Sequence, residues 1–237
     1  MREQEVLGQH VVSANIRNEY DKKLTIAYGG VAYGKTYPNG REEWVVYSVY
    51  DYVIGVYAKV ERIGNKFFKV KDSRGYYGLC DTEKEIIAPR YAGMDAIYDS
   101  GSEYLYLDVT ERGTDGLLKH GLLNPISEEH SSVLPCEYDR IEVISGHYRF
   151  KVTKNGRMGV VDDKGDVVVE PKYEYLNTYF VKTGGGKYTR MFFIVGSGGR
   201  FGAWDDNVRH YQWNQEMEVP MEYTVDQVKS MLEKRYK

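Results

Sequence analysis

Residues 159–173 read GVVDDKGDVVVEPKY, which is a short apolar strand, a tight turn, a second apolar strand, a proline and a tyrosine. Residues 78–91 and 121–138 repeat this order closely, and residues 202–223 repeat it more loosely. Strands this short, separated by polar and glycine-containing turns, are typical of hairpins. Because the same phrase returns along the chain, the sequence predicts a repeat fold.

A glycine opens each copy, and these glycines set the length of one unit. Gly78, Gly121, Gly159 and Gly202 follow one another at spacings of 43, 38 and 43 residues. Gly34 lies 44 residues before Gly78 and also follows a tyrosine, so we count a fifth, degenerate unit that lacks the proline. In the other four units the closing prolines are Pro89, Pro135, Pro171 and Pro220. Proline removes a ladder donor, so each should lie at a strand end or on an edge strand.

The repeats predict an all-β fold with a helix at the end. A further apolar strand precedes each glycine and a short apolar run follows each tyrosine, so we expect three antiparallel strands per unit over residues 24–223. Thr224 and Gln227 form a capping-box pattern before a helix expected at 225–236, which would cap the last repeat. Residues 1–20 would cap the first unit, and residues 1–237 form a single repeat domain.

Two arrangements fit five such units. A small β-propeller would close them into a ring of radial sheets. An open, curved array would stack them as a solenoid and leave terminal surfaces that need a cap. Three strands per unit and a C-terminal capping helix favour the open array, with the propeller as the alternative.

The motif resembles the WG-repeat proteins of bacteria. The resemblance covers residues 24–223 and rests on the glycine, the Asp or Asn three residues later, the turn, and the apolar strand ending in proline and tyrosine. The tryptophan that precedes the glycine in that family is replaced here by Tyr33, Tyr77, His120, Met158 and Phe201. The resemblance implies an architecture more than an activity.

Composition narrows the class of partner. The net charge of −3 does not suit a dedicated nucleic-acid binder, although residues 151–200 hold nine Lys or Arg against five Asp or Glu and leave weak nucleic-acid contact as a minor alternative. No apolar run has the length that crosses a bilayer, and the start has no secretory signal core. Cys80 and Cys136 cannot form a disulfide framework, so we expect a cytoplasmic protein without membrane partners.

No local motif indicates catalysis. The five histidines lack metal-ligand spacing and no Cys-x-x-Cys occurs, so no metal site is predicted. Residues 184–187, GGGK, continue into Tyr188 rather than the Ser or Thr of a phosphate loop, so we expect a hairpin tip and no cofactor. The sequence therefore predicts a protein that is not an enzyme, although an active site assembled across repeats would leave no local motif.

The N-terminal third carries the candidate binding residues, because aromatic rings gather there. Tyrosine and tryptophan dominate binding hot spots, since they offer a large rigid area with a polar handle. The candidates are Trp44, Tyr47, Tyr50, Tyr52 and Tyr57. The competing interpretation is that these rings pack between strands as core.

These observations predict a non-enzymatic β-repeat module that binds another protein, whose identity the sequence does not give. The alternative is a glycan- or cell-envelope-binding module in which exposed Tyr and Trp stack on sugar rings.

Overall fold

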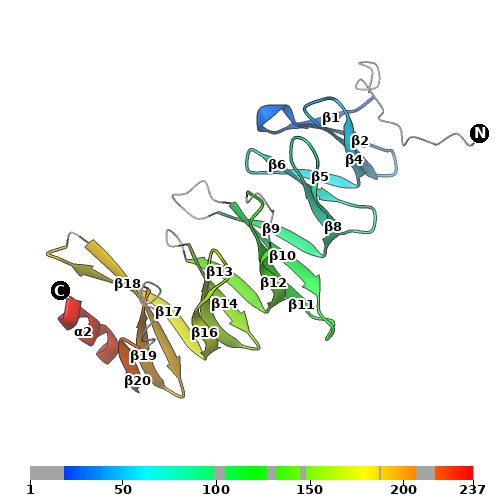
Figure 1. Cartoon of the computed structure of the whole chain (residues 1–237). Helices are drawn as coiled ribbons and strands as arrows, with labels where there is room; N and C mark the ends of the chain where they lie inside the picture. Colours follow the sequence, from blue (N-terminus) through cyan, green and yellow to red (C-terminus); the bar gives the residue numbers. More distant parts are fainter. Residues whose placement is uncertain are drawn as a thin grey trace, which may run out of the picture. The chain divides into compact units, whose positions relative to one another are not determined.

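The computed structural model describes residues 19–98, 105–126, 132–144, 148–186, 188–206 and 217–236 (Figure 1). The described residues form twenty β-strands, a 3₁₀ turn η1 (Ala27–Gly29) and the helix α2 (Val225–Tyr236). The predicted N-terminal cap covers residues 1–20, of which residues 1–18 lie outside the described residues.

The strands build five four-stranded sheets in which consecutive strands are neighbours. The first sheet has β1 (Lys22–Thr25), β2 (Val31–Thr36), β3 (Glu42–Tyr47) and β4 (Val53–Tyr57). The second has β5 (Lys59–Ile63), β6 (Phe67–Lys71), β7 (Tyr77–Cys80) and β8 (Glu85–Tyr91). The third has β9 (Gly93–Tyr98), β10 (Leu105–Arg112), β11 (Leu118–Leu123) and β12 (Ser132–Tyr138).

The fourth sheet has β13 (Arg140–Ile144), β14 (Arg149–Lys154), β15 (Arg157–Asp162) and β16 (Val167–Tyr173). The fifth has β17 (Tyr175–Thr183), β18 (Tyr188–Ser197), β19 (Arg200–Asp205) and β20 (Val219–Tyr223). The all-β antiparallel repeat fold and its C-terminal helix are therefore confirmed.

The number of strands per unit differs from the prediction, since each sheet has four strands and not three. The run after each closing tyrosine is the first strand of the following sheet. In the fourth sheet, Arg140 of β13 pairs with Thr153 of β14, and Asp139 donates its N–H to the Thr153 carbonyl at 2.8 Å. Strand propensity indicates that such a segment forms a strand, but it does not show whether the segment pairs with the strand before it or the strand after it.

A wide bulge opposite the motif glycine shapes the repeats. Met158 of β15 pairs with Tyr173 and Val160 pairs with Val169, so Gly159 alone faces the three residues 170–172. A Cβ on Gly159 would lie 2.5 Å from the Val169 carbonyl oxygen and 2.6 Å from the Pro171 nitrogen. The backbone of the bulged strand thus occupies the place of a side chain, and only glycine fits.

The same bulge recurs in two other sheets. Tyr77 and Leu79 pair with Tyr91 and Ile87 around Gly78, and a Cβ there would lie 2.4 Å from the Ile87 carbonyl oxygen. Gly202 faces β20 in the same register, with 2.5 Å to the Val219 carbonyl oxygen. On the strand before, a buried valine pairs with each motif glycine: Val70, Val109, Val152 and Val195.

The four prolines lie within the last strand of their sheets, which is an edge strand in every case. An edge strand can lose a donor on its outer side without breaking the ladder. The predicted edge position is confirmed, and the strand continues past the proline to the buried tyrosine, as at Tyr91 and Tyr173.

The first sheet corrects the placement of Gly34 as a motif glycine. Gly34 lies on β2 and pairs with Trp44, and a Cβ on it would lie 2.6 Å from the Trp44 ring. Trp44 pairs with Tyr57 as Met158 pairs with Tyr173, so Trp44 precedes the true motif position, which holds Val45. With valine there, β4 has neither proline nor the wide bulge. The prediction of Gly34 assumed a constant spacing between motif glycines. That assumption failed because turn lengths differ between repeats.

The strands gather in two compact units. Among the described residues, the first unit holds residues 19–97 and 105–132, and the second holds Tyr98 and residues 133–236. In the first, the facing sides of the first two sheets share one core, in which Trp44, Val46 and Tyr57 pack with Phe68 and Val70. The single-domain organisation stays a prediction.

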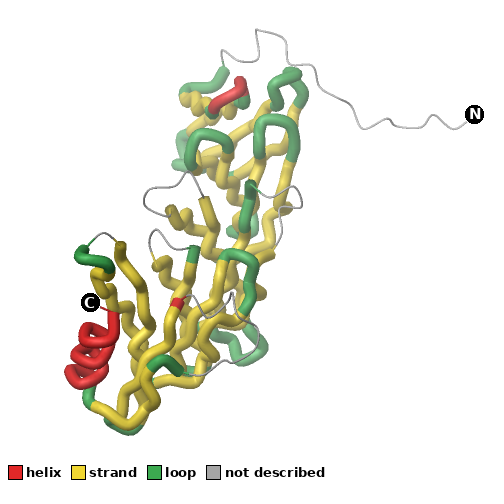
Figure 2. Tube along the Cα trace, turned by 60° about the vertical axis from the view of Figure 1, so that its left-hand side comes forward, coloured by secondary structure: helices red, strands yellow, loops and turns green. Residues whose placement is uncertain are grey.

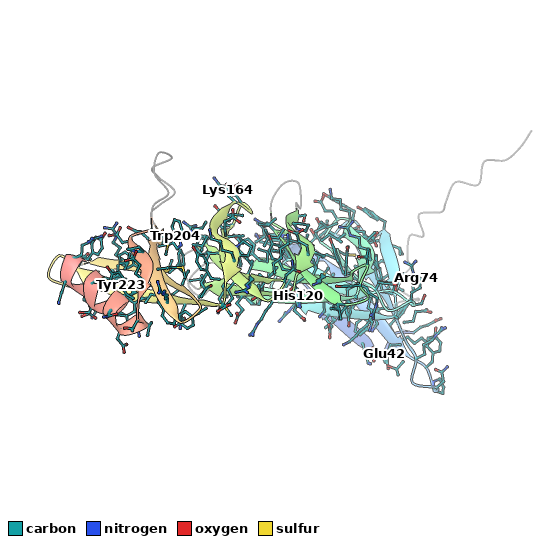
Figure 3. All side chains as sticks on the ribbon, turned by 90° about the horizontal axis from the view of Figure 1, so that it is seen from below. Glu42, Arg74, His120, Lys164, Trp204 and Tyr223 are labelled. Carbon is teal, nitrogen blue, oxygen red and sulfur yellow. The ribbon has the colours of Figure 1, made fainter. Side chains whose placement is uncertain are left out.

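In the second unit the fifth sheet is buried on both faces. Met191, Phe193 and Val195 of β18 pack with Val160 and other residues of the fourth sheet. The alternate residues Phe192 and Ile194 pack under α2. Trp204 of β19, labelled in Figure 3, donates its indole N–H to the Tyr173 hydroxyl at 3.1 Å.

The helix α2 lies along one face of the fifth sheet (Figure 2). Val228 and Leu232 are buried against that face. The capping box is present: Gln227 donates its N–H to the Thr224 hydroxyl at 3.3 Å, and Thr224 donates its N–H to the Gln227 side chain at 2.9 Å. The helix therefore caps the array by covering a sheet face.

Gly159→Ala should lower the free energy of unfolding of the second unit by about 1–3 kcal/mol, because the new methyl group meets backbone that cannot move aside cheaply. Urea unfolding followed by circular dichroism measures the change. The control is Gly185→Ala, where the Cβ meets nothing within 4 Å and only the positive φ of 66° is strained, at a cost of about 1 kcal/mol. Equal losses for the two variants would contradict the packing explanation.

Candidate interaction surface

Three of the five predicted binding residues are core residues, which corrects their proposed role at a surface. Trp44 and Tyr57 pack between the first two sheets, and Tyr47 is only 2% exposed. Trp44 donates its indole N–H to Glu42 at 2.9 Å, and Tyr57 donates its hydroxyl to Glu85 at 2.8 Å. The competing interpretation, that these rings pack as core, holds for these three, because none of them is more than 6% exposed.

Tyr50 and Tyr52 lie in the turn between β3 and β4 and remain available to a partner. Tyr50 is 70% exposed, and the two rings stack with centroids 6.4 Å apart and planes 14° from parallel. The Tyr52 hydroxyl donates to the Glu83 carbonyl in the turn between β7 and β8. The pair therefore forms a flat, anchored aromatic platform.

Ser48 holds this turn in place. Its hydroxyl oxygen accepts the N–H of Tyr50 at 3.1 Å and the N–H of Tyr52 at 3.4 Å, while Asp51 takes a φ of +63°. In the clearest repeat, Asp162 likewise accepts from Lys164 and Asp166. Ser48 thus fills the Asp or Asn position of the motif, three residues after Val45. A side-chain oxygen is needed at this position because it accepts backbone N–H groups of the turn that follows.

Tyr28 is a candidate residue that sequence reasoning did not select. It lies in η1 between β1 and β2, it is 77% exposed, and its φ is +63°. A bulky residue with positive φ is uncommon, because the left-handed region favours glycine or asparagine. The signal in the sequence is the order Tyr28-Gly29-Gly30, a turn in which the aromatic residue precedes two glycines.

Hydrogen bonds between turns bring these residues together at one end of the first unit. Val49 donates its N–H to the Thr82 carbonyl at 2.8 Å, and Ala27 donates to the Asn65 carbonyl at 2.6 Å. A Cβ on Gly29 would lie 3.6 Å from the Val49 side chain, so the turns that carry Tyr28 and Tyr50 lie close together.

A pocket of about 250 Å³ opens beside Tyr28. Its lining includes Lys66, Asp81, Thr82 and Ile126, the last of which is 43% exposed. We call Tyr28, Tyr50, Tyr52, Thr82 and Ile126 the turn surface. It combines exposed rings with an apolar hollow and charges of both signs, which suits the recognition of a mixed polar and apolar partner.

Two reactive types of side chain, the imidazole of His120 and the thiol of Cys80, lie outside the turn surface. His120 on β11 (Figure 3) contacts both oxygens of Asp108, at 2.8 and 3.0 Å, and burial raises the pKa of Asp108 although His120 opposes that rise. Burial raises the pKa of the Cys80 thiol to about 12, so it stays protonated at neutral pH. Within the described residues, no three His, Cys, Asp or Glu side chains are placed to hold a metal ion.

In the part of the chain that the structure describes, α2 is too short and too polar to cross a bilayer, and no other helix qualifies.

Comparison with known proteins identifies one repeat directly. Residues 158–188 match the family model described as WG containing repeat, so the resemblance to WG repeats is confirmed for the copy that holds Gly159 and Pro171. No curated protein matches the chain.

Among solved structures, the β-propeller domain of the Trilobed protease from Pyrococcus furiosus, described as having an open velcro topology, aligns with a TM-score of 0.32 and 9% identity. The alignment covers 86% of this chain and 72% of that chain.

Ser48→Ala should release the Tyr50–Tyr52 turn and lower the free energy of unfolding by about 1 kcal/mol. The reason is that the N–H groups of Tyr50 and Tyr52 lose their acceptor. Amide hydrogen exchange at Tyr50 and Tyr52 should accelerate, as measured by NMR. The control is Ser48→Asn, which restores an acceptor of the kind that Asn124 supplies to Ile126 in the third sheet. Unchanged exchange in Ser48→Ala would show that the hydroxyl does not hold the turn.

Proposed function

We propose that this chain is a non-enzymatic β-repeat module that binds another protein through the turn surface. The observation that carries the proposal is Tyr28, a large aromatic residue kept in a left-handed conformation where it is almost fully exposed.

Folding stability does not account for a tyrosine at this position. The left-handed conformation costs a residue with a Cβ about 1–2 kcal/mol, and asparagine or glycine would avoid much of that cost. A side chain that is 77% exposed recovers little of it by burying apolar area. Strain of this kind persists where function needs the side chain, and here it would present the ring to a partner.

The surroundings of Tyr28 suit protein recognition. Tyr50 and Tyr52 add a second aromatic group, and inter-turn hydrogen bonds hold the two groups before any partner arrives. Rigid aromatic residues lose little conformational entropy on binding, so a preorganised cluster gains affinity. The apolar hollow next to Ile126 would receive one side chain of the partner.

The absence of catalysis is part of the proposal. His120 is the one histidine among the described residues, and its ring nitrogen is engaged by Asp108. Cys80 is buried and protonated, so it does not suit a nucleophile.

A glycan-binding module is the second candidate, and the parallel arrangement of Tyr50 and Tyr52 favours it. A flat exposed ring can stack on the apolar face of a sugar, and Asp81 and Lys66 beside the pocket could accept from and donate to hydroxyl groups. A glycan array probed with the purified chain distinguishes this candidate, since a protein-binding module should give no specific signal there.

Tyr28→Asn should lose partner capture by about tenfold or more while stability stays equal or rises by about 1 kcal/mol, because asparagine tolerates positive φ. Capture is measured by affinity purification from the native lysate with quantitative mass spectrometry, and stability by thermal unfolding. A loss of binding at unchanged or greater stability would show that Tyr28 is needed for recognition of the partner and not for folding.

The matched control is Tyr76→Asn, which changes an exposed tyrosine in the connection between β6 and β7, at the opposite end of the second sheet. It should leave capture unchanged. A partner retained equally by Tyr28→Asn and Tyr50→Ala would refute the turn surface as its binding site.

A further inference from the structure

Asp81 carries a negative charge that its turn does not need. It fills the Asp or Asn position of the motif in the second sheet, and its Oδ1 accepts the N–H groups of Glu83 and Lys84 at 2.7 Å each. Ser48 and Asn124 fill the same position in the first and third sheets, and they accept turn N–H groups without a charge. Turn chemistry therefore does not account for the charge of Asp81.

The second oxygen of the Asp81 carboxylate, Oδ2, has no hydrogen-bond partner among the described residues. In the repeat that holds Gly159, the corresponding Asp162 is completely buried. Asp81 is only half-buried, and it lines the pocket of about 250 Å³ beside Tyr28. An accessible carboxylate therefore borders a cavity that a ligand can enter.

Lys66 brings a positive charge to the same pocket. It lies in the turn between β5 and β6, and its side chain is exposed. Its ammonium group forms no ion pair and no hydrogen bond with any residue of the described ranges, Asp81 included. Lys66 and Asp81 are the two charged residues of the described lining, so the lining has one charge of each sign and a net charge of zero.

The remaining lining is largely apolar. Tyr28, Phe67, Pro125 and Ile126 provide it, together with Thr82. Phe67 is 6% exposed and Ile126 is 43% exposed, so the apolar lining extends from the core to the surface. Pockets for drug-sized ligands measure about 300–1,000 Å³, and a smaller pocket suits a ligand the size of one amino-acid residue.

Hydrogen bonds hold the pocket open before a ligand arrives. The N–H of Ala27 donates to the Asn65 carbonyl at 2.6 Å, which links η1 to the turn between β5 and β6. The side chain of Asn124 accepts the N–H of Ile126 at 3.0 Å, and the turn N–H groups fix the Asp81 carboxylate. A pocket whose walls are fixed in this way loses little entropy when a ligand binds.

The two charges select the class of ligand. A ligand with a single charge would pair with one of them and would take water from the other without replacing it, which costs binding free energy. A ligand that carries both an ammonium and a carboxylate group pairs with both. An apolar group on the same ligand would fill the rest of the pocket.

We propose that this pocket binds a free α-amino acid with an apolar side chain. The ammonium group pairs with Asp81, the carboxylate pairs with Lys66, and the side chain lies against Phe67 and Ile126 beside the Tyr28 ring. The proposal goes beyond the proposed function and does not rest on it, because it needs no partner protein. A bound amino acid would compete with a partner side chain for this pocket.

The test uses the full chain and three probes. They are L-phenylalanine, phenethylamine, which lacks the carboxylate, and 3-phenylpropanoate, which lacks the ammonium group. L-Phenylalanine should bind about tenfold more tightly than either of the others, as measured by NMR titration of backbone amide signals at neutral pH. The signals that move should be those of Lys66, Asp81, Thr82 and Ile126.

Two variants separate the two charges. Lys66→Gln should remove the preference for L-phenylalanine over phenethylamine, and Asp81→Asn should remove the preference over 3-phenylpropanoate. Asparagine keeps the turn acceptor, as Asn124 does in the third sheet. The matched control is Lys84→Gln, which removes an exposed cation from the turn of Asp81 but does not touch the pocket lining and should leave both preferences unchanged. Thermal unfolding verifies that all three variants are folded.

Three results would overturn the proposal. The first is no saturable change of the amide signals with L-phenylalanine. The second is equal binding of the three probes, because the pocket would then be an apolar hollow in which the charges select nothing. The third is a preference that Lys66→Gln and Asp81→Asn leave unchanged. None of these results bears on partner capture, which Tyr28→Asn tests without added amino acid.

Discussion

The approach of an edge-strand backbone to a glycine is the constraint on which the repeats depend. At Gly78, Gly159 and Gly202 a carbonyl oxygen lies 2.4 to 2.5 Å from the position that a Cβ would take, and three residues bulge over the glycine. The proline is one of the three bulged residues, and the strand returns to register at the tyrosine. One contact therefore closes an edge against further pairing and fixes where the chain leaves for the next sheet.

The first sheet shows what happens without that contact. Val45 occupies the motif position, β4 has no proline, and the close approach moves to Gly34, which lies under the Trp44 ring. Trp44, which precedes the motif position in this sheet, is a core residue. The sheet that lacks the motif glycine and proline also carries, in its turns, the two most exposed aromatic residues of the described chain, Tyr28 and Tyr50.

The proposed turn surface would bind through side chains rather than through main-chain groups. Hydrogen bonds between turns hold its rigid rings in place, which favours a folded or knob-like epitope.

The sequence by itself determined the repeat, the motif glycines from Gly78 onward, the edge position of the prolines and the capped C-terminal helix. These features depend on local chemistry: a missing Cβ, a missing N–H, and a side chain that caps its own helix. Only the tertiary structure decided that Gly34 belongs to another strand, that each sheet has four strands, and which aromatic rings reach solvent. Trp44, Tyr47 and Tyr57 resemble Tyr50 and Tyr52 in composition, and only the structure shows that the first three lie on buried strands and the other two in a turn.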